Sequence, residues 1–463
     1  MPTATTTARR RLLVVAALAV GASVLPASTP ASASAPPLPP APRTAPVAGT
    51  RLPALLDRRI ASLVPRRVAA ARALGRYRTG MVTDPVTGAV LWSSGAGTPM
   101  RGASTTKLAT AVTTLHVLGT GTRFPTRVVA GTSARDLVLV AGGDPLLTSS
   151  QLRSLARDTA RALLPAVPAA PATPPPAGTP PRVVRYTVEV DDTLFPRPSA
   201  ALGWTSSYQP WVVTPVRPLV RDLRNGWDTS ADVAAYFAGQ VGTALRGLLA
   251  DRPDLRPHVV YTGRARAAAG AAEVARFAGN SSGAALRWML LVSDNDVAEM
   301  LFRQNALHSG AGAGWAAASA TELATLRSLG VDVRGWRLYD GSGVSRDDRV
   351  SARGLVQLLT VADSPYHPEL NPLRGWLPVA GVSGTLSASA HRFTTRPTSC
   401  ARGLVSAKTG TLFDTIGLAG YAHGSDGGVR PFAVLVHSVD PRYSKLTVRH
   451  AVEVVPATAT GCY

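Results

Sequence analysis

Lysine is nearly absent from this chain of 463 residues. Of its 49 basic residues, only Lys107, Lys408 and Lys445 are lysines, so arginine supplies almost all of the positive charge. Arginine stays protonated in proteins, whereas a lysine can lose its proton when its pKa falls. The few lysines therefore mark positions where a removable proton could matter, and two of them lie in candidate motifs.

Cysteine is also scarce, since Cys400 and Cys462 are the only two. In an oxidising compartment such a pair can form a disulfide, which would tie the end of the chain to the segment before Lys408. Two free thiols are the alternative, because the distance between the Cα atoms decides the matter.

The residues that usually bind catalytic zinc lack the necessary spacing. The eight histidines are scattered, and no H-E-x-x-H pattern occurs. Asp144, Asp191 and Asp192 could suggest a metal, but turns and strand ends explain them better. We therefore predict no metal and no cofactor.

Long apolar runs are missing after the N-terminus. Three arginines at 9–11 precede an apolar run at 12–25 and an Ala-Ser-Ala-Ser-Ala stretch at 31–35, a pattern typical of an export signal. We predict a signal peptide at 1–35, a Pro/Ala-rich leader at 36–50, and action outside the cytoplasm. The net charge of +21 then favours anionic wall polymers, or a solvated surface without a dedicated partner, over nucleic acid.

The first candidate motif lies at 102–109 (GASTTKLA), where Ser104 and Lys107 are three residues apart at the start of a predicted helix that ends at Gly119. Residues i and i+3 share one face of a helix. A serine hydroxyl becomes a good nucleophile when a nearby base accepts its proton, and burial would lower the pKa of a lysine enough for that role. The alternative for Ser104 is a simple helix N-cap.

The end of the chain gives the clearest prediction of a fold. Strands are predicted at 403–411, 415–423 and 430–439, and a hairpin is predicted at 77–93. Together they would form a five-stranded antiparallel sheet in an α/β fold, with helices on both faces. The predicted helices span 52–64, 105–119, 282–292, 296–306, 351–361 and 444–455.

The middle of the chain has a different pattern of predicted elements. Short strands at 136–141 and 183–190, a helix at 151–164 and a proline-rich loop at 164–181 predict a smaller α+β domain over 122–274. It would be inserted into a catalytic domain formed by 51–121 and 275–463. A strand followed by a turn is predicted at 336–344.

Two further motifs follow the inserted region. Ser293-Asp294-Asn295 separates two predicted helices, and helix capping is the alternative role for Asn295. Lys408-Thr409-Gly410-Thr411 lies on a predicted edge strand. It offers a positive charge for a carboxylate, hydroxyl groups, and a glycine that a substrate backbone can approach.

The ordered set S-x-x-K, S-x-N and K-T-G resembles the motifs of penicillin-binding proteins and class A β-lactamases. The chain is similar to the class C low-molecular-weight penicillin-binding proteins, which form the D-alanyl-D-alanine carboxypeptidase/endopeptidase family and share the penicillin-binding-protein/β-lactamase-like fold. The resemblance covers roughly residues 50–460. It also rests on the segments at 142–145 (GGDP), 191–195 (DDTLF), 293–299 (SDNDVAE) and 339–343 (YDGSG).

This resemblance implies a serine D-Ala-D-Ala carboxypeptidase acting on the stem peptides of peptidoglycan. Ser104 would attack the carbonyl between the two D-alanines, and Lys107 would accept its proton. Ser293 would pass that proton to the leaving amine, and Asn295 would hold the substrate amide. Water would then hydrolyse the acyl-enzyme, and β-lactam antibiotics would acylate the same serine.

The resemblance also assigns substrate-binding roles to the K-T-G strand. Lys408 and Thr409 would bind the terminal carboxylate, and Gly410 would let the substrate lie close. The backbone N–H groups of Ser104 and Thr411 would form an oxyanion hole. One departure is that the stretch at 208–228 lacks the longer insertion common in this family, which leaves open what that insertion contributes to substrate choice.

Three alternatives remain open. A β-lactamase shares the motifs, although none of the six glutamates lies in the E-x-x-L-N setting that class A enzymes use. An esterase could use Gly279-x-Ser281-x-Gly283, and a wall protein that binds penicillin could turn over slowly. The sequence does not decide between carboxypeptidase and endopeptidase activity, the preferred stem peptide, or the oligomeric state.

Overall fold

The computed structural model describes residues 52–84, 86–173 and 175–463. The predicted signal peptide at 1–35 and the leader at 36–50 lie outside these residues. Within the described ranges, no helix combines the length and apolar character needed to cross a bilayer.

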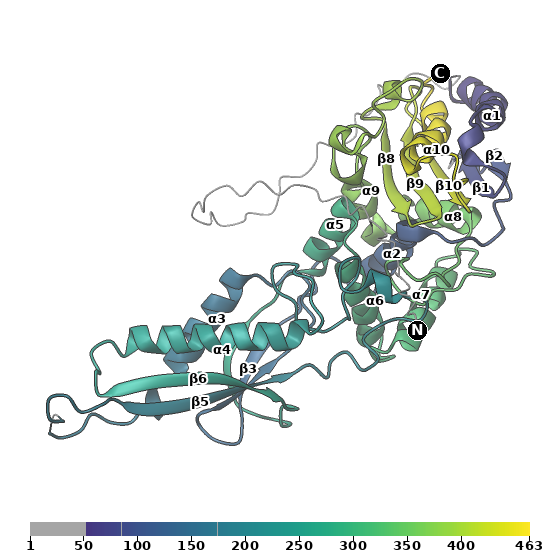
Figure 1. The fold of residues 1–463 in the computed structure, drawn as a ribbon. Helices are drawn as coiled ribbons and strands as arrows, with labels where there is room; N and C mark the ends of the chain where they lie inside the picture. The colour runs from purple at the N-terminus through teal and green to yellow at the C-terminus, as the bar shows by residue number, and fades with distance from the viewer. Residues whose placement is uncertain (1–51, 85, 174) are drawn as a thin grey trace, which may run out of the picture. The chain divides into compact units, whose positions relative to one another are not determined.

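The first sheet has five strands, and every neighbouring pair is antiparallel. Its order is β2 (Val90–Ser94), β1 (Arg78–Thr83), β10 (Val429–His437), β9 (Thr415–His423) and β8 (Val405–Thr411) (Figure 1). This arrangement confirms the predicted sheet of an early hairpin and three late strands. It also places the K-T-G segment on an edge strand.

Helices cover both faces of this sheet, as predicted. Successive side chains of a strand point to opposite faces, so Leu418 and Val434 pack into a core with α1 (Leu52–Ala70) and α10 (Lys445–Ala459). Their neighbours in sequence join the other core, where α8 (Ala352–Ala362) packs. Figure 1 shows α10 lying across the strands. Burial on both faces explains why β9 and β10 read as nearly continuous apolar runs.

A group of helices packs against one face of the first sheet. It contains α2 (Lys107–Val117), α5 (Ser282–Val292), α6 (Asn295–His308) and α7 (Trp315–Ser328), of which α7 was not predicted. These helices share the α8 core. They are the elements that carry two of the three motifs.

Of the strand and following turn predicted at 336–344, the turn is present but the strand is wrong. Only an isolated bridge joins Arg337 to Arg349, and the chain then turns. The cause is Asp340, whose buried carboxylate accepts the backbone N–H groups of Gly343 at 2.7 Å and Ser345 at 2.6 Å. Such bonds stabilise a turn in place of a strand ladder.

A second five-stranded sheet lies between residues 126 and 277. Its order is β6 (Leu255–Arg264), β5 (Arg182–Asp191), β4 (Asp136–Val140), β3 (Thr126–Ala130) and β7 (Glu273–Phe277). The β4–β5 and β5–β6 pairs are parallel, and the others are antiparallel. Helices α3 (Ser149–Ala162) and α4 (Thr229–Leu248) share its apolar core. The domain boundaries at 122 and 274 stay predictions.

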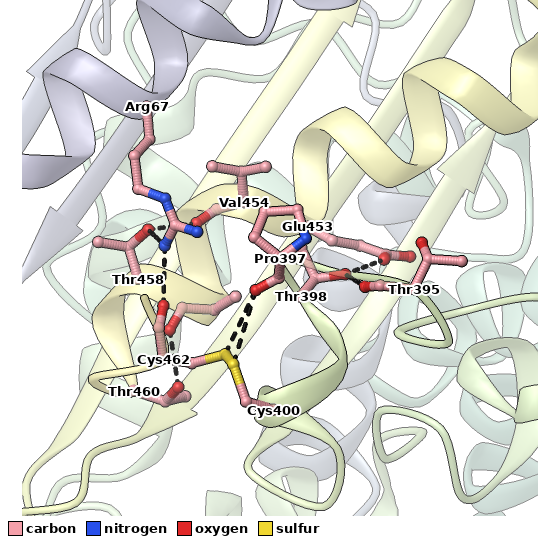
Figure 2. The surroundings of a disulfide bond; sticks show 11 residues. Arg67, Thr395, Pro397, Thr398, Cys400, Glu453, Val454, Thr458, Thr460 and Cys462 are labelled. Atoms are coloured by element: carbon pink, nitrogen blue, oxygen red, sulfur yellow. Dashed lines mark hydrogen bonds between the residues drawn. A yellow bond between two sulfur atoms is a disulfide. The ribbon is translucent and has the colours of Figure 1, made fainter.

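A disulfide joins Cys400 to Cys462, with 5.7 Å between their Cα atoms (Figure 2). Beside it, Arg67 of α1 donates hydrogen bonds of 2.8 Å to the Thr458 hydroxyl and to the Cys462 carbonyl. The last residues of the chain are therefore attached both to α1 and to the segment that precedes β8.

Candidate active site

Ser104 lies in a single 3₁₀ turn, Ala103–Thr106, that leads into α2. The preceding residue, Ala103, has a φ of 47°, a left-handed conformation that is costly for a residue with a β-carbon. The N-cap position of α2 is Thr106, and no side chain caps it. The N-cap interpretation of Ser104 is therefore wrong, and its hydroxyl instead meets Lys107.

Lys107 is fully buried and its ammonium group has three oxygen partners. The Nζ atom lies 3.2 Å from Ser104 Oγ, 2.6 Å from Asn295 Oδ1 and 2.9 Å from the carbonyl oxygen of Ser342. Helix α2 places the lysine one turn after the serine, as the spacing predicted. The contact to Asn295 brings the first and second motifs together.

Burial lowers the pKa of Lys107 to about 8, because the charged ammonium is removed from water. The negative charges of Glu299 and Asp340 oppose part of that decrease. A lysine with this pKa is neutral in an appreciable fraction of molecules near neutral pH, so it can accept a proton from Ser104.

The second motif lies where α5 ends and α6 begins. Ser293 ends α5 with a left-handed φ of 66°, and Asp294 caps α6 by accepting the Val297 N–H at 3.0 Å. Asn295 is therefore not the cap. Its side chain accepts from Lys107 and donates a 2.6 Å hydrogen bond to the Val212 carbonyl.

Lys408 of β8 is fully buried beside the second motif. Its Nζ atom donates to Ser293 Oγ at 2.7 Å and to the Thr409 carbonyl at 2.9 Å. Burial and the nearby charge of Lys107 both hold the pKa of Lys408 well below its usual value. A chain of polar contacts thus runs from Ser104 through Lys107 to Asn295, and a separate contact joins Ser293 to Lys408.

Two glycines allow these segments to pack so closely. A β-carbon on Gly410 would lie 2.6 Å from the carbonyl oxygen of Gly102, in the turn that carries Ser104. A β-carbon on Gly343, whose φ is +77°, would lie 2.0 Å from the carbonyl oxygen of Ala103. The K-T-G glycine thus has a packing reason within the chain itself, beside the substrate approach expected from the sequence.

The turn at 340–343 contains positioning residues that the motif analysis did not assign. Glu299 of α6 is fully buried and accepts the backbone N–H groups of Gly341 at 2.8 Å and Ser342 at 3.0 Å. Burial and the neighbouring Asp340 raise the pKa of Glu299 well above its usual value. These contacts fix the Ser342 carbonyl against Lys107. The sequence signals that pointed to them were the YDGSG segment and the SDNDVAE segment that ends at Glu299.

A pocket of about 290 Å³ opens at Ser104. It is lined by Ser104, Ser293, Thr385, Ala390, Arg392, Thr409, Thr411 and Arg449. The pocket therefore brings together residues of all three motifs. The two arginines were not predicted, because arginine is so common in this chain that it carries no signal by itself.

Ser281, the serine of the alternative G-x-S-x-G pattern, has a structural role. Its hydroxyl caps α5 by accepting the Ala284 N–H at 3.2 Å. It does not line the pocket at Ser104. The esterase arrangement would require a serine at a sharp turn with a base beside it, so this geometry favours the capping role.

Comparisons with known proteins show the family of the chain. The family model described as the D-Ala-D-Ala carboxypeptidase 3 (S13) family matches residues 64–223 and 261–458. Carboxypeptidase DacB of Mycolicibacterium smegmatis is 30% identical over 404 residues, which are 83% of this chain and 80% of that protein. D-alanyl-D-alanine carboxypeptidase of Actinomadura sp. is 28% identical over 432 residues, 75% of each chain.

A solved structure shows the same fold. Penicillin-binding protein 4 of Haemophilus influenzae superposes with a TM-score of 0.65 at 18% identity, over 84% of this chain and 98% of that chain. The family model includes all three motifs and most of the chain. The chain therefore belongs to the D-Ala-D-Ala carboxypeptidase 3 (S13) family, whose members are peptidases and thus hydrolases.

Proposed function

We propose that the protein is a serine D-Ala-D-Ala carboxypeptidase of peptidoglycan that works through an acyl-enzyme on Ser104. The observation that carries the proposal is the 3.2 Å contact between Ser104 Oγ and a buried lysine whose pKa is lowered to about 8. Neutral Lys107 takes the hydroxyl proton while Oγ forms a bond to the penultimate D-alanine carbonyl carbon. The backbone N–H groups of Ser104 and Thr411 stabilise the developing oxyanion.

The tetrahedral intermediate then collapses with loss of the terminal D-alanine. Ser293 passes a proton to the leaving nitrogen, and Lys408 holds the Ser293 hydroxyl through their 2.7 Å hydrogen bond. Asn295 holds the substrate amide, and the hydroxyls of Thr409 and Thr411 bind the leaving residue. Water next attacks the ester, gives up its proton to the same base, and releases the shortened peptide.

The competing functions have less support. The matched family is one of D-Ala-D-Ala carboxypeptidases, and Ser281 has a capping contact. A β-lactamase would need a base for fast deacylation, and no E-x-x-L-N segment supplies one. Endopeptidase cleavage of cross-links uses the same bond type and belongs to this proposal as a second activity.

The proposal also implies where the protein acts and what it binds. The substrate lies outside the cytoplasm, so we propose export through the segment at 1–35 and formation of the Cys400–Cys462 disulfide after export. Partners are stem peptides ending in D-Ala-D-Ala and β-lactams that acylate Ser104. The net charge of +21 supports contact with anionic wall polymers.

The direct test uses a purified protein and an N-acylated peptide that ends in D-Ala-D-Ala. We expect release of D-alanine, and a lasting mass adduct on Ser104 after incubation with benzylpenicillin. Rapid hydrolysis of benzylpenicillin without an adduct would favour a β-lactamase. An adduct without D-alanine release would favour a slow penicillin-binding wall protein.

A further inference from the structure

Lys408 is poorly placed to supply the charge for a substrate carboxylate. It is fully buried, and its Nζ atom donates hydrogen bonds to two oxygens of the protein, those of the Ser293 side chain and the Thr409 carbonyl. It does not line the pocket at Ser104. Burial and Lys107 also hold its pKa well below the usual value, so its charge is weakened. A carboxylate that enters the pocket needs another cation.

Two guanidinium groups line the same pocket. Arg392 lies in the segment before β8, and Arg449 lies on α10, so they reach the pocket from separate elements. The pocket's remaining lining consists of hydroxyl side chains and one alanine, Ala390. No acidic residue among the described residues lines it.

The charges behind the pocket do not cancel. Arg392 is only 4% exposed and its Nε donates to the buried carboxylate of Glu453, which also accepts the Phe393 N–H at 3.1 Å and the Thr398 hydroxyl at 3.2 Å. The Arg392 Nη2 atom is buried without a hydrogen-bond partner among the described residues. Glu453 therefore balances one arginine and leaves the pocket with an excess positive charge.

That excess comes from Arg449. No described residue forms an ion pair with this half-buried arginine, and its pKa is lowered by burial and by the charge of Arg392. A bound anion would remove this repulsion and supply the missing partner. The pocket is thus built for a carboxylate beside the nucleophile.

We propose that Arg449, backed by Arg392, binds the free α-carboxylate of the D-alanine that leaves, and that this contact sets the preference for peptides with a free C-terminus. The inference rests on the proposed function. In this arrangement, the hydroxyls of Thr409 and Thr411 donate hydrogen bonds to the same α-carboxylate. Lys408 positions Ser293 and does not contact the substrate.

The test compares one N-acylated peptide ending in D-Ala-D-Ala with its C-terminal amide. For each substrate, kcat/KM is measured for the wild type and for Arg449→Gln, Arg449→Lys and Arg327→Gln. Arg327 is an exposed arginine at the end of α7, outside this pocket, so its substitution is a control with the same change of net charge. Thermal melting checks that each variant folds.

We expect Arg449→Gln to lower kcat/KM for the free acid about tenfold or more, as loss of a hydrogen bond between charged groups implies. The effect on the amide should be much smaller, so the preference for the acid falls. Arg449→Lys should keep part of the preference, and Arg327→Gln should keep all of it.

An equal loss for acid and amide would show a merely structural role for Arg449 and overturn the inference. Unchanged kcat/KM for both peptides in Arg449→Gln would also overturn it, while leaving the proposed function intact. A wild type that cleaves neither peptide would overturn both.

Discussion

The two sheets of this protein show how burial relates to the location of chemistry. Strands β9 and β10 of the first sheet are buried along almost their whole length, because helices cover both faces. In the second sheet, β5 alternates between exposed and buried residues, and β6 is mostly partly exposed or exposed. The K-T-G motif lies on the first sheet, and no residue assigned to the site lies on the second sheet's strands.

The difference has a physical cause. A lysine changes its pKa strongly only where water is excluded, and a sheet covered on both faces provides such a place at its edge. Lys408 at that edge and Lys107 at the start of the adjoining helix α2 are both fully buried. A sheet with one open face cannot exclude water to the same degree. The following predictions test whether the chemistry depends on the first sheet and its surroundings and not on the second sheet.

Removal of the nucleophile should have the largest effect. Ser104→Ala should lower benzylpenicillin acylation and D-alanine release by about ten-thousandfold or more, because Ser104 carries the one pocket hydroxyl that is hydrogen-bonded to Lys107 among the described residues. Ser281→Ala is the matched control and should leave acylation unchanged, at a cost of about 1 kcal/mol in the free energy of unfolding for the lost helix cap. Retained activity in Ser104→Ala, with loss in Ser281→Ala, would reverse the assignment.

Lys107→Arg should be the next most damaging change. Arginine keeps the positive charge but cannot give up its proton, so acylation should fall by about a hundredfold to ten-thousandfold. The rate is measured by mass spectrometry of the adduct on Ser104, with circular dichroism as the folding control. A folded variant that is acylated at a normal rate would show that Lys107 is not the base.

The pH dependence of acylation should follow Lys107. Its pKa is lowered to about 8, and only the neutral amine accepts a proton. The rate should therefore rise about tenfold per pH unit below this value and level off above it. Stopped-flow or quenched-flow acylation by benzylpenicillin between pH 6 and 9.5 measures the profile. A flat profile over this range would contradict the assigned base.

Loss of the disulfide should affect stability more than chemistry. Cys400→Ser with Cys462→Ser opens a link between residues 62 apart, so the free energy of unfolding should fall by about 3 to 4 kcal/mol. Denaturant unfolding measures this change. The acylation rate of the folded variant should stay within about twofold, because no residue of the disulfide lines the pocket. A large drop in the acylation rate of a fully folded variant would show that the disulfide positions β8 for catalysis.

Smaller expected losses of stability come from a pair of core substitutions that compares the sheets directly. Leu418→Ala in β9 and Val188→Ala in β5 each remove a fully buried side chain, at a cost of about 2 to 3 kcal/mol in unfolding free energy. Leu418 lies opposite Thr409 in the β8–β9 pairing, so its loss should also slow acylation severalfold. Val188→Ala should not, and a matching slowdown there would contradict the separation of roles.

Much of the first sheet could be predicted from sequence. Its strands are apolar and bounded by short turns, and β9 was predicted with the bounds that the structure shows. The second sheet was harder. Strands β6 and β7 were missed because their residues are mostly not buried, so the apolar pattern is weak. In the segment at 336–344 the turn was predicted correctly, but the strand before it was predicted wrongly because its apolar residues alternate, while the deciding group was the buried carboxylate of Asp340.

The sequence by itself determined the three motifs, their order and the sheet that carries Lys408, because these depend on local residue types and hydrophobic period. Only the tertiary structure decided which atoms meet. It brought Asn295 to Lys107, Ser293 to Lys408, and Arg392 and Arg449 to one pocket with Ser104. These contacts join residues more than one hundred positions apart, or arginines that look alike in the sequence. Burial, which lowers the pKa of Lys107 and of Lys408, is a property of the whole packed molecule.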